Sequence, residues 1–191
     1  MTITEQKKLQ RAAGISARNT LAPDERAAAN AALCRRIAQE EAFQNATVLL
    51  AYAAFGGEAD LSALAAEAVR LGKTVAYPIC GADFTMTAAV PAAQDGWEVG
   101  KYGIRTPILC RARPLEPEEL ELVLVPCTAF DAKCRRVGMG KGYYDRYLPR
   151  CRRAVTIGVA FEAQRVDQAA AEETDRRPDF FITEGGKYTW K

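Results

Sequence analysis

Three glycines alternate with larger residues between positions 138 and 142, and their spacing could serve phosphate chemistry. The segment reads Gly-Met-Gly-Lys-Gly, with Lys141 inside it and Arg135 and Arg136 shortly before it. Glycines let backbone N–H groups approach a phosphate because no Cβ stands in the way, and nearby cations offset the phosphate's charge. Asp145 follows closely, where a carboxylate could hold a magnesium ion bound to the same phosphates. This arrangement predicts a site for the phosphates of a nucleotide.

A tight turn with a solvated basic face is the alternative interpretation of these glycines. Short glycine motifs are common by chance, and this one matches neither G-x-x-x-x-G-K-S/T nor G-x-G-x-x-G. Spacing alone gives the two interpretations equal weight.

The elements on either side of the glycines would place them at the end of a strand. Leu120–Val125 is a short apolar run, typical of a strand that is buried on both faces. A polar, basic loop follows over 128–137, and 143–148 can continue as a helix until Pro149 discourages it. This order suits an anion site, because a helix start adds unpaired N–H donors to those of the glycine loop.

The residues of this stretch resemble the signature of a known family. V-P-C-T-A-F-D followed by R-V-G-M-G-K-G-Y-Y-D is similar to the V-P-G-L-A-F-D and R-L-G-x-G-x-G-Y-Y-D of the 5-formyltetrahydrofolate cyclo-ligases, also called methenyltetrahydrofolate synthetases. The matching positions are Pro126, Ala129, Phe130, Asp131, Arg136, Gly138, Gly140, Gly142, Tyr143, Tyr144 and Asp145. Cys127 and Cys134 stand where that family usually has glycine, and we expect both to be small, half-buried filler.

The resemblance implies conversion of 5-formyltetrahydrofolate to 5,10-methenyltetrahydrofolate with ATP as co-substrate, Mg²⁺ as cofactor, and ADP and phosphate as products. It implies that the formyl oxygen is phosphorylated and that N10 then attacks to close the ring. The catalytic cations would be Arg136 and Lys141. The ATP-binding set would be Lys7, Arg11, Arg136, Gly138, Met139, Gly140, Lys141, Gly142, Tyr143 and Tyr144. Alanine in place of Arg136 or Lys141 is then expected to lower turnover far more than stability.

The resemblance also implies residues for the folate and for the metal. Glu58 and Tyr143 would border the folate, and Asp145 and Asp175 would hold magnesium, with Asp179 the second choice after Asp175. A carboxylate such as Glu58 can accept two hydrogen bonds from the N–H donors of a pterin ring. From the residues alone, Glu58 could equally be an exposed loop acid, whereas the charged segment around Asp175 is better explained as a solvated loop.

The N-terminal part of the chain predicts two helices and a strand. Residues 4–19 look helical, although Gly14 weakens that prediction, and an exposed basic helix is the alternative to nucleotide binding by Lys7 and Arg11. Pro23 starts a second helix that runs to position 38. A strand over 47–52 opens into the Gly-Gly-Glu segment that carries Glu58, where ligands of open α/β sheets collect.

The remaining pattern predicts strands at 74–79, 84–90, 154–161 and 180–183 and a helix over 61–71. The first strand and that at 74–79, joined by the helix, should pair in parallel. Residues 91–117 are irregular and predict a long surface loop region, in which Trp97, Tyr102 and Ile104 could line a pocket for an aromatic ring. Thr106 stands where the family has glutamate, so no role is transferred to it.

These patterns predict a single-domain α/β layered fold over 1–191 with a mostly parallel central sheet. The resemblance implies the architecture shared by ribose-5-phosphate isomerases and CoA-transferases. The 191 residues are 49% hydrophobic and 26% charged, as in an ordinary globular protein. We expect a cytoplasmic monomer that acts on a small molecule, with no membrane or nucleic-acid partner, because the net charge is only +2 and the N-terminus lacks the apolar core of a secretion signal.

The absence of histidine narrows the chemistry. The sequence has six cysteines but no histidine and no C-x-x-C pair, which excludes the usual zinc-site spacings and any Ser-His-Asp or Cys-His arrangement. Phosphoryl transfer tolerates this composition, because it needs positioning and charge more than a protein base. Two rival functions stay open: a sugar-phosphate isomerase, which would need no ATP, and a protein that binds RNA through its basic region at 133–153.

Overall fold

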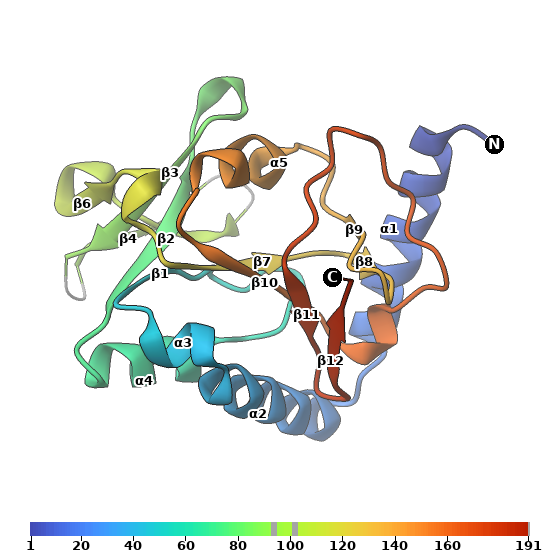
Figure 1. The fold of residues 1–191 in the computed structure, drawn as a ribbon, viewed down its shortest axis with the longest axis horizontal. Coiled ribbons are helices and arrows are strands. Elements are labelled where there is room, and N and C mark those ends of the chain that lie inside the picture. The colour runs from blue at the N-terminus through green and yellow to red at the C-terminus, as the bar shows by residue number, and fades with distance from the viewer. Residues whose placement is uncertain (93–94, 101–102, 191) are drawn as a thin grey trace.

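An eight-stranded sheet forms the centre of the computed structural model, which describes residues 1–92, 95–100 and 103–190 (Figure 1). The strand order is β12-β11-β10-β7-β1-β2-β3-β6. The strands are β1 Val48–Leu50, β2 Thr74–Cys80, β3 Met86–Pro91, β6 Ala112–Leu115, β7 Leu122–Pro126, β10 Val155–Val159, β11 Phe180–Ile182 and β12 Lys187–Thr189. The middle strands from β11 to β2 pair in parallel, whereas β12, β3 and β6 join antiparallel. This confirms the predicted mostly parallel sheet, including the pairing of β1 with β2.

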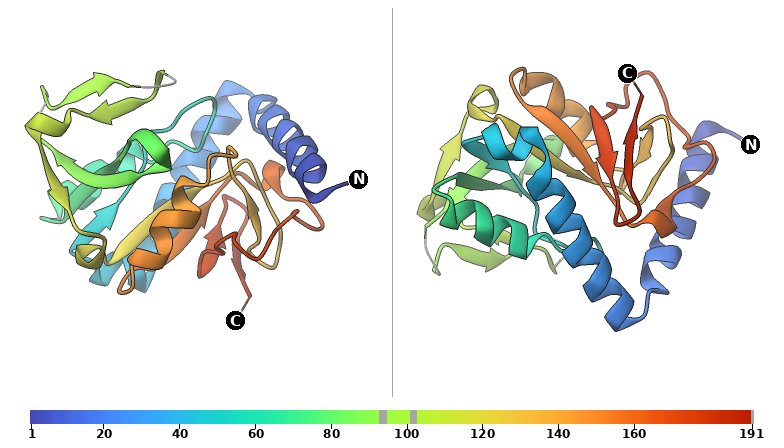
Figure 2. Two further views of the ribbon diagram at one scale, coloured as in Figure 1. Left: turned by 90° about the horizontal axis from the view of Figure 1, so that it is seen from above. Right: turned by 60° about the horizontal axis from the view of Figure 1, so that its bottom comes forward.

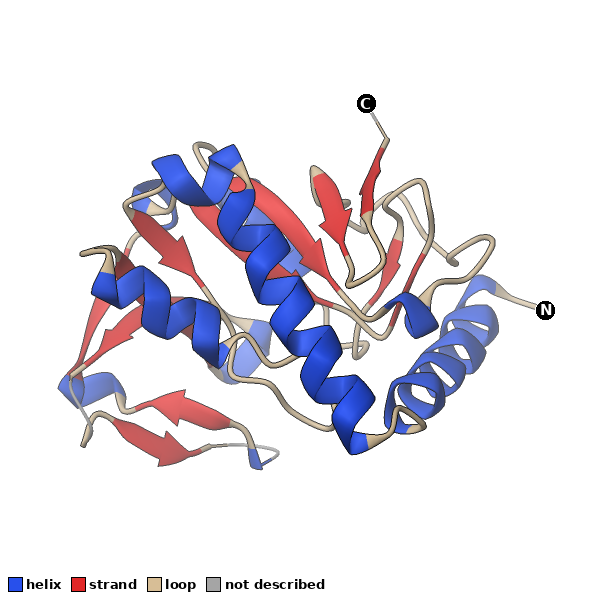
Figure 3. Cartoon of the chain, turned by 90° about the horizontal axis from the view of Figure 1, so that it is seen from below, coloured by secondary structure: helices blue, strands red, loops and turns tan. Residues whose placement is uncertain are grey.

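Helices cover both faces of the sheet. They are α1 Ile3–Asn19, α2 Pro23–Gln39, α3 Glu41–Asn45, α4 Ser62–Arg70 and α5 Tyr143–Tyr147. Helices α2, α3 and α4 lie on one face (Figure 3), and α5 lies on the opposite face. Alternate residues of β7 serve the two sides: Leu122 and Leu124 pack in the core under α2 and α4, and Val123 and Val125 pack with Tyr147 of α5. Burial on both faces explains why β7 is continuously apolar.

Helix α1 lies at one side of the sheet, against the short strands β8 Ala129–Phe130 and β9 Arg136–Val137 (Figure 2). It begins with a capping box of Thr2 and Glu5 and continues unbroken past Gly14. Gly14 is buried, and a Cβ there would lie 1.9 Å from the carbonyl oxygen of Thr128. The glycine that weakened the prediction of a helix is therefore the residue that lets the helix dock.

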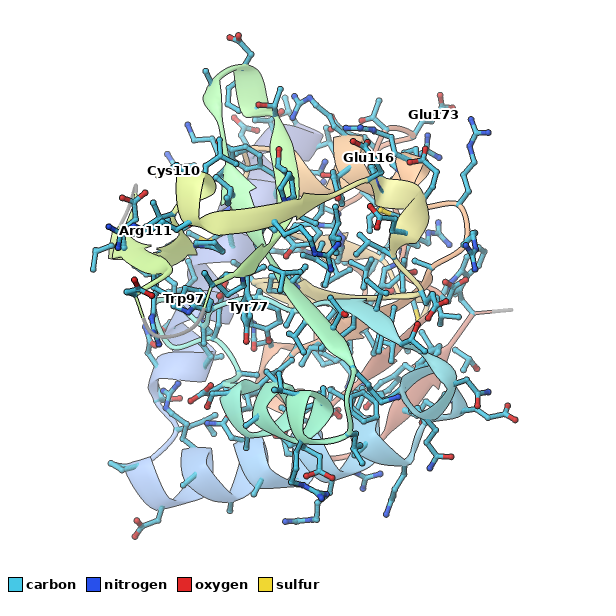
Figure 4. All side chains as sticks on the ribbon, turned by 90° about the vertical axis from the view of Figure 1, so that its left-hand side faces the viewer. Tyr77, Trp97, Cys110, Arg111, Glu116 and Glu173 are labelled. Atoms are coloured by element: carbon cyan, nitrogen blue, oxygen red, sulfur yellow. The ribbon has the colours of Figure 1, made fainter. Side chains whose placement is uncertain are left out.

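The prediction of a long irregular loop over 91–117 is largely wrong. This region forms a hairpin of β4 Trp97–Val99 with β5 Arg105–Pro107, followed by β6 at the edge of the main sheet. Proline suggested loop, but Pro114 fits an edge strand because one side of such a strand needs no N–H donor. The ring of Trp97 packs edge-on against Tyr77 at 4.7 Å (Figure 4), whereas the predicted pocket residue Tyr102 lies outside the described residues.

Four further short elements were not predicted. Residues 128–137, expected to be loop, contain the hairpin of β8 and β9. Its turn depends on the fully buried Asp131, whose carboxylate accepts hydrogen bonds from the backbone of Lys133, Arg135 and Ala169. The short α3 and the last strand β12 were also not predicted, because neither is long enough to show a hydrophobic period in the sequence. In the part of the chain that is described, no helix combines the length and apolar character needed to cross a bilayer.

Candidate active site

The glycine segment, residues 138–142, forms the turn between β9 and α5 with two residues in the left-handed region. Gly140 has φ +92° and Gly142 has φ +66°, backbone conformations that residues with a Cβ rarely adopt. The Nε of Arg11 donates to the carbonyl oxygen of Gly138 at 2.8 Å, and a Cβ on Gly140 would lie 3.1 Å from the same guanidinium. The structure therefore brings Arg11 of α1 against the glycine segment; the family resemblance assigned both to the nucleotide, and that role stays a prediction. Helix α5 has only five residues, so its start contributes less to an anion site than expected.

Lys7, one turn before Arg11 on α1, lies in a cluster of opposite charge. Its Nζ is 2.6 Å from Asp175 Oδ2 and 2.8 Å from Glu172 Oε2. Burial lowers the pKa of Lys7, but hydrogen bonds to the two carboxylates outweigh burial and leave the pKa raised. A predicted nucleotide ligand and a predicted metal ligand are thus paired with each other.

The other predicted metal ligand, Asp145, is paired with the predicted catalytic cation Arg136. The guanidinium NH2 of Arg136 is 2.5 Å from Asp145 Oδ1, which also accepts the backbone N–H of Arg176 at 3.0 Å. Arg136 is buried, and its Nε donates to the carbonyl oxygen of Arg176. The loop that carries Asp175 is thereby fixed beside Asp145.

Asp145 and Asp175 are each paired with a cation, Arg136 and Lys7, so a magnesium ion there would take most of its ligands from phosphate and water. Within the described residues, no group of three or more His, Cys, Asp or Glu side chains could hold a metal. Mg²⁺ at nucleotide sites is usually held by one or two carboxylates and by the phosphates themselves, so two aspartates suffice. Asp179, the second choice, is used elsewhere, because its Oδ2 accepts the N–H and the hydroxyl of Thr156.

Phe84, at the tip of the β2–β3 hairpin, reaches the glycine segment from the other side. Its ring is half-exposed and lies 6.0 Å from Lys141 Nζ, 5.1 Å from the Arg146 guanidinium and 6.1 Å from the ring of Tyr143. The Tyr143 hydroxyl donates to the carbonyl oxygen of Gly81 in the same hairpin at 3.4 Å. Nothing in the sequence links this hairpin to the glycines, so its role was missed.

Glu58 is a largely covered acid, not an exposed loop residue. Only 12% of its side chain is exposed, and its Oε2 accepts the backbone N–H of Phe55 at 3.1 Å. Burial raises the pKa of Glu58, and the charge of Arg18 and the Phe55 N–H counter part of that rise. Glu58 is also an electrostatic neighbour of Tyr144, whose pKa is raised by burial first and by Glu58 second. The Tyr144 hydroxyl is buried and has no hydrogen-bond partner among the described residues.

The structure brings some of the predicted residues together. Arg11 bonds to the glycine segment, Arg136 bonds to Asp145 just after it, and Lys7 pairs with Asp175, whereas Glu58 is linked to this region only through its electrostatic influence on Tyr144. Arg18 was missed, although a signal existed: Lys7, Arg11, Gly14 and Arg18 are spaced by four, three and four residues, which places them on one face of a helix.

The two cysteines at positions where the family usually has glycine are fully buried. Cys134 has φ +58°, which explains a preference for glycine there, and it packs with Phe130 and Phe181. Cys127 lies among charged groups, yet burial raises its pKa to about 12. Both act as neutral packing residues, more buried than expected. All six cysteines are free thiols.

Comparisons with known proteins identify the family. The 5-formyltetrahydrofolate cyclo-ligase family matches residues 3–184. The 5-formyltetrahydrofolate cyclo-ligase of Escherichia coli K12 is 28% identical over 145 residues, which cover 73% of this chain and 79% of that protein. The probable 5-formyltetrahydrofolate cyclo-ligase of Caenorhabditis elegans is 29% identical over 174 residues, 81% of each chain. The Haemophilus influenzae cyclo-ligase is 35% identical over 77 residues, so the matched part spans about two fifths (41%) of that relative's length.

Solved structures agree in fold. The NMR structure of Aquifex aeolicus 5,10-methenyltetrahydrofolate synthetase has a TM-score of 0.83 at 26% identity, covering 97% of this chain and 93% of that one. The Mycoplasma pneumoniae 5,10-methenyltetrahydrofolate synthetase has a TM-score of 0.76 at 22% identity, covering 93% and 98%, and is a likeness of fold alone. The match over residues 3–184 places nearly the whole sequence within one family. The chain belongs to the 5-formyltetrahydrofolate cyclo-ligase family.

Proposed function

We propose that this protein converts 5-formyltetrahydrofolate to 5,10-methenyltetrahydrofolate, with ATP as co-substrate and ADP and phosphate as products. The observation that carries the proposal is the meeting of two kinds of site at one place. The glycine segment with Arg11 and Arg136 suits phosphates, and the largely covered Glu58, an electrostatic neighbour of Tyr144, suits a ring with N–H donors.

The phosphate side would consist of the glycine segment and its cations. The left-handed Gly140 and Gly142 leave backbone N–H groups open to an anion, because no Cβ covers them. Lys141, which is exposed, and Arg136, which is buried, would offset the charge that develops on the transferred phosphoryl group. Arg11 would hold the segment in shape through the Gly138 carbonyl while its remaining N–H groups face the nucleotide.

The metal would be held by Asp145 and Asp175 together with the phosphates. Magnesium bound there would neutralise charge between the β- and γ-phosphates. Its entry requires Lys7 to release Asp175 or to share it, and Lys7 is then available to the nucleotide. Arg136 would keep Asp145 oriented throughout.

The folate side would hold the pterin ring through Glu58. The carboxylate accepts ring N–H and amino hydrogens, and Tyr143, fixed by its hydroxyl to the β2–β3 hairpin, borders the ring. A pterin held in this way would direct its formyl group toward the glycine segment. The transfer needs only proximity and charge stabilisation from the protein.

The chemistry has two steps that balance. The formyl oxygen attacks the γ-phosphorus and ADP leaves, which gives an iminium phosphate at N5. N10 then attacks the formyl carbon, the N10 proton is lost to solvent, and the C–O bond breaks to release phosphate. The remaining N5–C–N10 bridge is the methenyl cation. Oxygen attached to phosphorus leaves readily as phosphate, whereas the formyl oxygen alone is a poor leaving group.

The test is the absorbance of the methenyl product, followed with 5-formyltetrahydrofolate, Mg²⁺ and purified protein, with and without ATP. We expect product only with ATP, and one phosphate released for each ring closed. Product without ATP, or ATP consumption without ring closure, would refute the proposal.

Lys141→Ala tests the phosphate side of the same assay. The variant should lose at least about 100-fold in kcat, a typical loss for one group that stabilises transition-state charge. Lys133→Ala is the matched control, because Lys133 is also an exposed lysine of this basic region but lies in the β8–β9 turn. Equal activity of the two variants would contradict the assignment of the glycine segment.

A further inference from the structure

Arg18, in the last turn of α1, is a fully buried arginine that holds the loop carrying Glu58. It is 1% exposed. Its Nε donates to the carbonyl oxygen of Gly56 at 3.0 Å and its NH2 donates to that of Phe55 at 3.4 Å. Burying a guanidinium costs free energy unless hydrogen bonds or an opposite charge offset the cost. These two hydrogen bonds supply part of that compensation and fix the position of the Arg18 side chain.

The third nitrogen of Arg18 faces Glu58 without bonding to it. NH1 is 3.9 Å from Glu58 Oε1, beyond hydrogen-bond reach, and it has no hydrogen-bond partner among the described residues. Other acids of this region are in closed pairs: Arg135 is 2.6 Å from Asp131, and Arg136 is 2.5 Å from Asp145. The Arg18–Glu58 pair is open by comparison.

Because Arg18 does not hydrogen-bond to Glu58, it supplies an opposite charge and leaves a carboxylate oxygen of Glu58 free to accept a hydrogen bond. Attraction at 3.9 Å inside a protein is still strong, because few waters screen it. Oε2 of Glu58 accepts the Phe55 N–H, whereas Oε1 accepts no hydrogen bond from a described residue. A closed pair would occupy the lone pairs that a ligand needs.

The other groups around Glu58 cannot replace this charge. They are Tyr52 at the end of β1, Cys127 after β7 and Tyr144 of α5. Burial raises the pKa of each, so all three stay neutral in the range where a carboxylate titrates. Arg136 neighbours Cys127 and Tyr144 and is already paired with Asp145.

We propose that Arg18 is a positioning residue of the substrate site, which keeps Glu58 ionised and in place while leaving Oε1 for the N–H donors of the pterin ring. This inference rests on the proposed function. It assigns to the N-terminal helix a part in folate recognition, in addition to the nucleotide contacts of Lys7 and Arg11.

Arg26 of α2 provides a matched control. Its NH1 donates to the carbonyl oxygen of Gly57 at 2.9 Å and its NH2 donates to that of Arg18 at 2.5 Å. Arg26 therefore braces the same loop from the next helix and forms no ion pair with Glu58. Loss of Arg26 loosens the loop without removing the counter-charge.

The experiment measures equilibrium binding of 5-formyltetrahydrofolate, without ATP, between pH 5 and 8. The proteins are the wild type, Arg18→Met, Arg18→Lys, Arg26→Met and Glu58→Gln. Wild-type affinity should fall toward acid pH as Glu58 takes up a proton. We call this fall in affinity the acid limb. Removing an opposite charge this close raises a carboxyl pKa by about one unit or more, so the acid limb of Arg18→Met should lie at higher pH by that amount.

The variants separate charge from mere bracing. Arg18→Lys should return the limb most of the way toward the wild-type position, because it restores the charge. Arg26→Met should lose affinity at all pH values and keep the wild-type limb. Glu58→Gln should show no limb beyond the substrate's own titration, which is common to all five proteins.

Three results would overturn the inference. They are an unshifted limb in Arg18→Met, an equal shift in Arg26→Met, or a wild-type limb in Glu58→Gln. Circular dichroism verifies folding, and if Arg18→Met does not fold, Arg18→Gln replaces it, because glutamine keeps N–H donors for the loop carbonyls and removes the charge. A wild type that binds no 5-formyltetrahydrofolate would refute the proposed function itself, whereas binding with an unshifted limb would refute only the role of Arg18.

Discussion

Arg136 and Lys141, the two predicted catalytic cations, occupy opposite environments. Lys141 is exposed on the glycine segment, whereas Arg136 is buried and bonded to Asp145 and to the Arg176 carbonyl. The sequence suggested that alanine at either position would affect turnover far more than stability. The structure keeps that expectation for Lys141 and changes it for Arg136.

Arg136→Ala should lower stability as well as activity. It leaves the largely buried Asp145 without its cation, and breaking such a pair costs about 2–3 kcal/mol of unfolding free energy. Urea denaturation measures this loss. The double variant Arg136→Ala/Asp145→Asn should regain part of the stability, because the lone carboxylate is gone, but no activity. A single variant as stable as the wild type would contradict the buried pairing.

The cysteines should differ sharply in reactivity because only the thiolate is nucleophilic. Burial raises the pKa of Cys127 to about 12 and those of Cys134 and Cys151 to about 11. Cys80 and Cys110 are exposed (Figure 4 labels Cys110), although partial burial of the thiol also raises the pKa of Cys80. A thiol with a raised pKa forms the thiolate only as the pH approaches that pKa. At pH 8 a thiol of pKa about 12 is roughly one ten-thousandth thiolate.

Iodoacetamide at pH 8 should therefore modify Cys80 and Cys110 first in the native protein. Peptide mass spectrometry reads each site, and the urea-unfolded protein, in which all six react, is the control. Rapid native labelling of Cys127 or Cys134 would show that the region around the glycine segment opens easily.

At the scale of elements, α1 decides whether the site is complete. It brings Lys7, Arg11 and Arg18 to three parts of the site: the 172–175 loop, the glycine segment and the Glu58 loop. Its docking requires the close approach at Gly14. A helix without tertiary contacts of this kind would be an exposed basic helix, which was the alternative from sequence.

Gly14→Ala should destabilise the protein although alanine is the better helix former. Alanine improves helix propensity by about 1 kcal/mol, but its Cβ would meet the Thr128 carbonyl oxygen, and such overpacking costs about 1–3 kcal/mol beyond that gain. Ala13→Gly, on the exposed side, is the matched control and should cost about 1 kcal/mol. Urea denaturation compares them. If Gly14→Ala is the more stable of the two, α1 does not pack as described.

At the scale of the whole molecule, a bound nucleotide would connect segments that are far apart in the chain. The start of α1, the glycine segment and the 172–177 loop already contact one another through Lys7, Arg11 and Asp145. A ligand that binds only the folded arrangement stabilises it by mass action.

ATP with Mg²⁺ should therefore raise the melting temperature. At about 100 times the dissociation constant the gain is about 2.7 kcal/mol, or roughly 5–10 °C for a chain of this size. ATP with EDTA should give a smaller shift, because Asp145 and Asp175 then face the phosphates without a cation between them. Asp145→Asn should reduce the difference between the two conditions. Equal shifts of the melting temperature with and without Mg²⁺ would contradict the assignment of both aspartates as metal ligands.

The sequence by itself determined the longer helices and the parallel strands, and it indicated the family. Continuous apolar runs predicted the parallel strands, and the spacing of identical residues at 126–145 was enough to indicate the family. Both signals are local: a strand buried on two faces needs apolar residues throughout, and a phosphate loop needs glycines at fixed intervals.

Tertiary structure alone decided which distant groups meet. Lys7 against Asp175, Arg18 against Glu58 and Phe84 against Lys141 join residues of separate elements. It also turned the proline-containing 91–117 region into a hairpin and an edge strand. Burial and pairing depend on how the elements pack against one another. Packing results from many contacts between distant residues, so it cannot be inferred from any one residue. For that reason candidate site residues could be named one by one from the sequence, but which of them pair with each other could not.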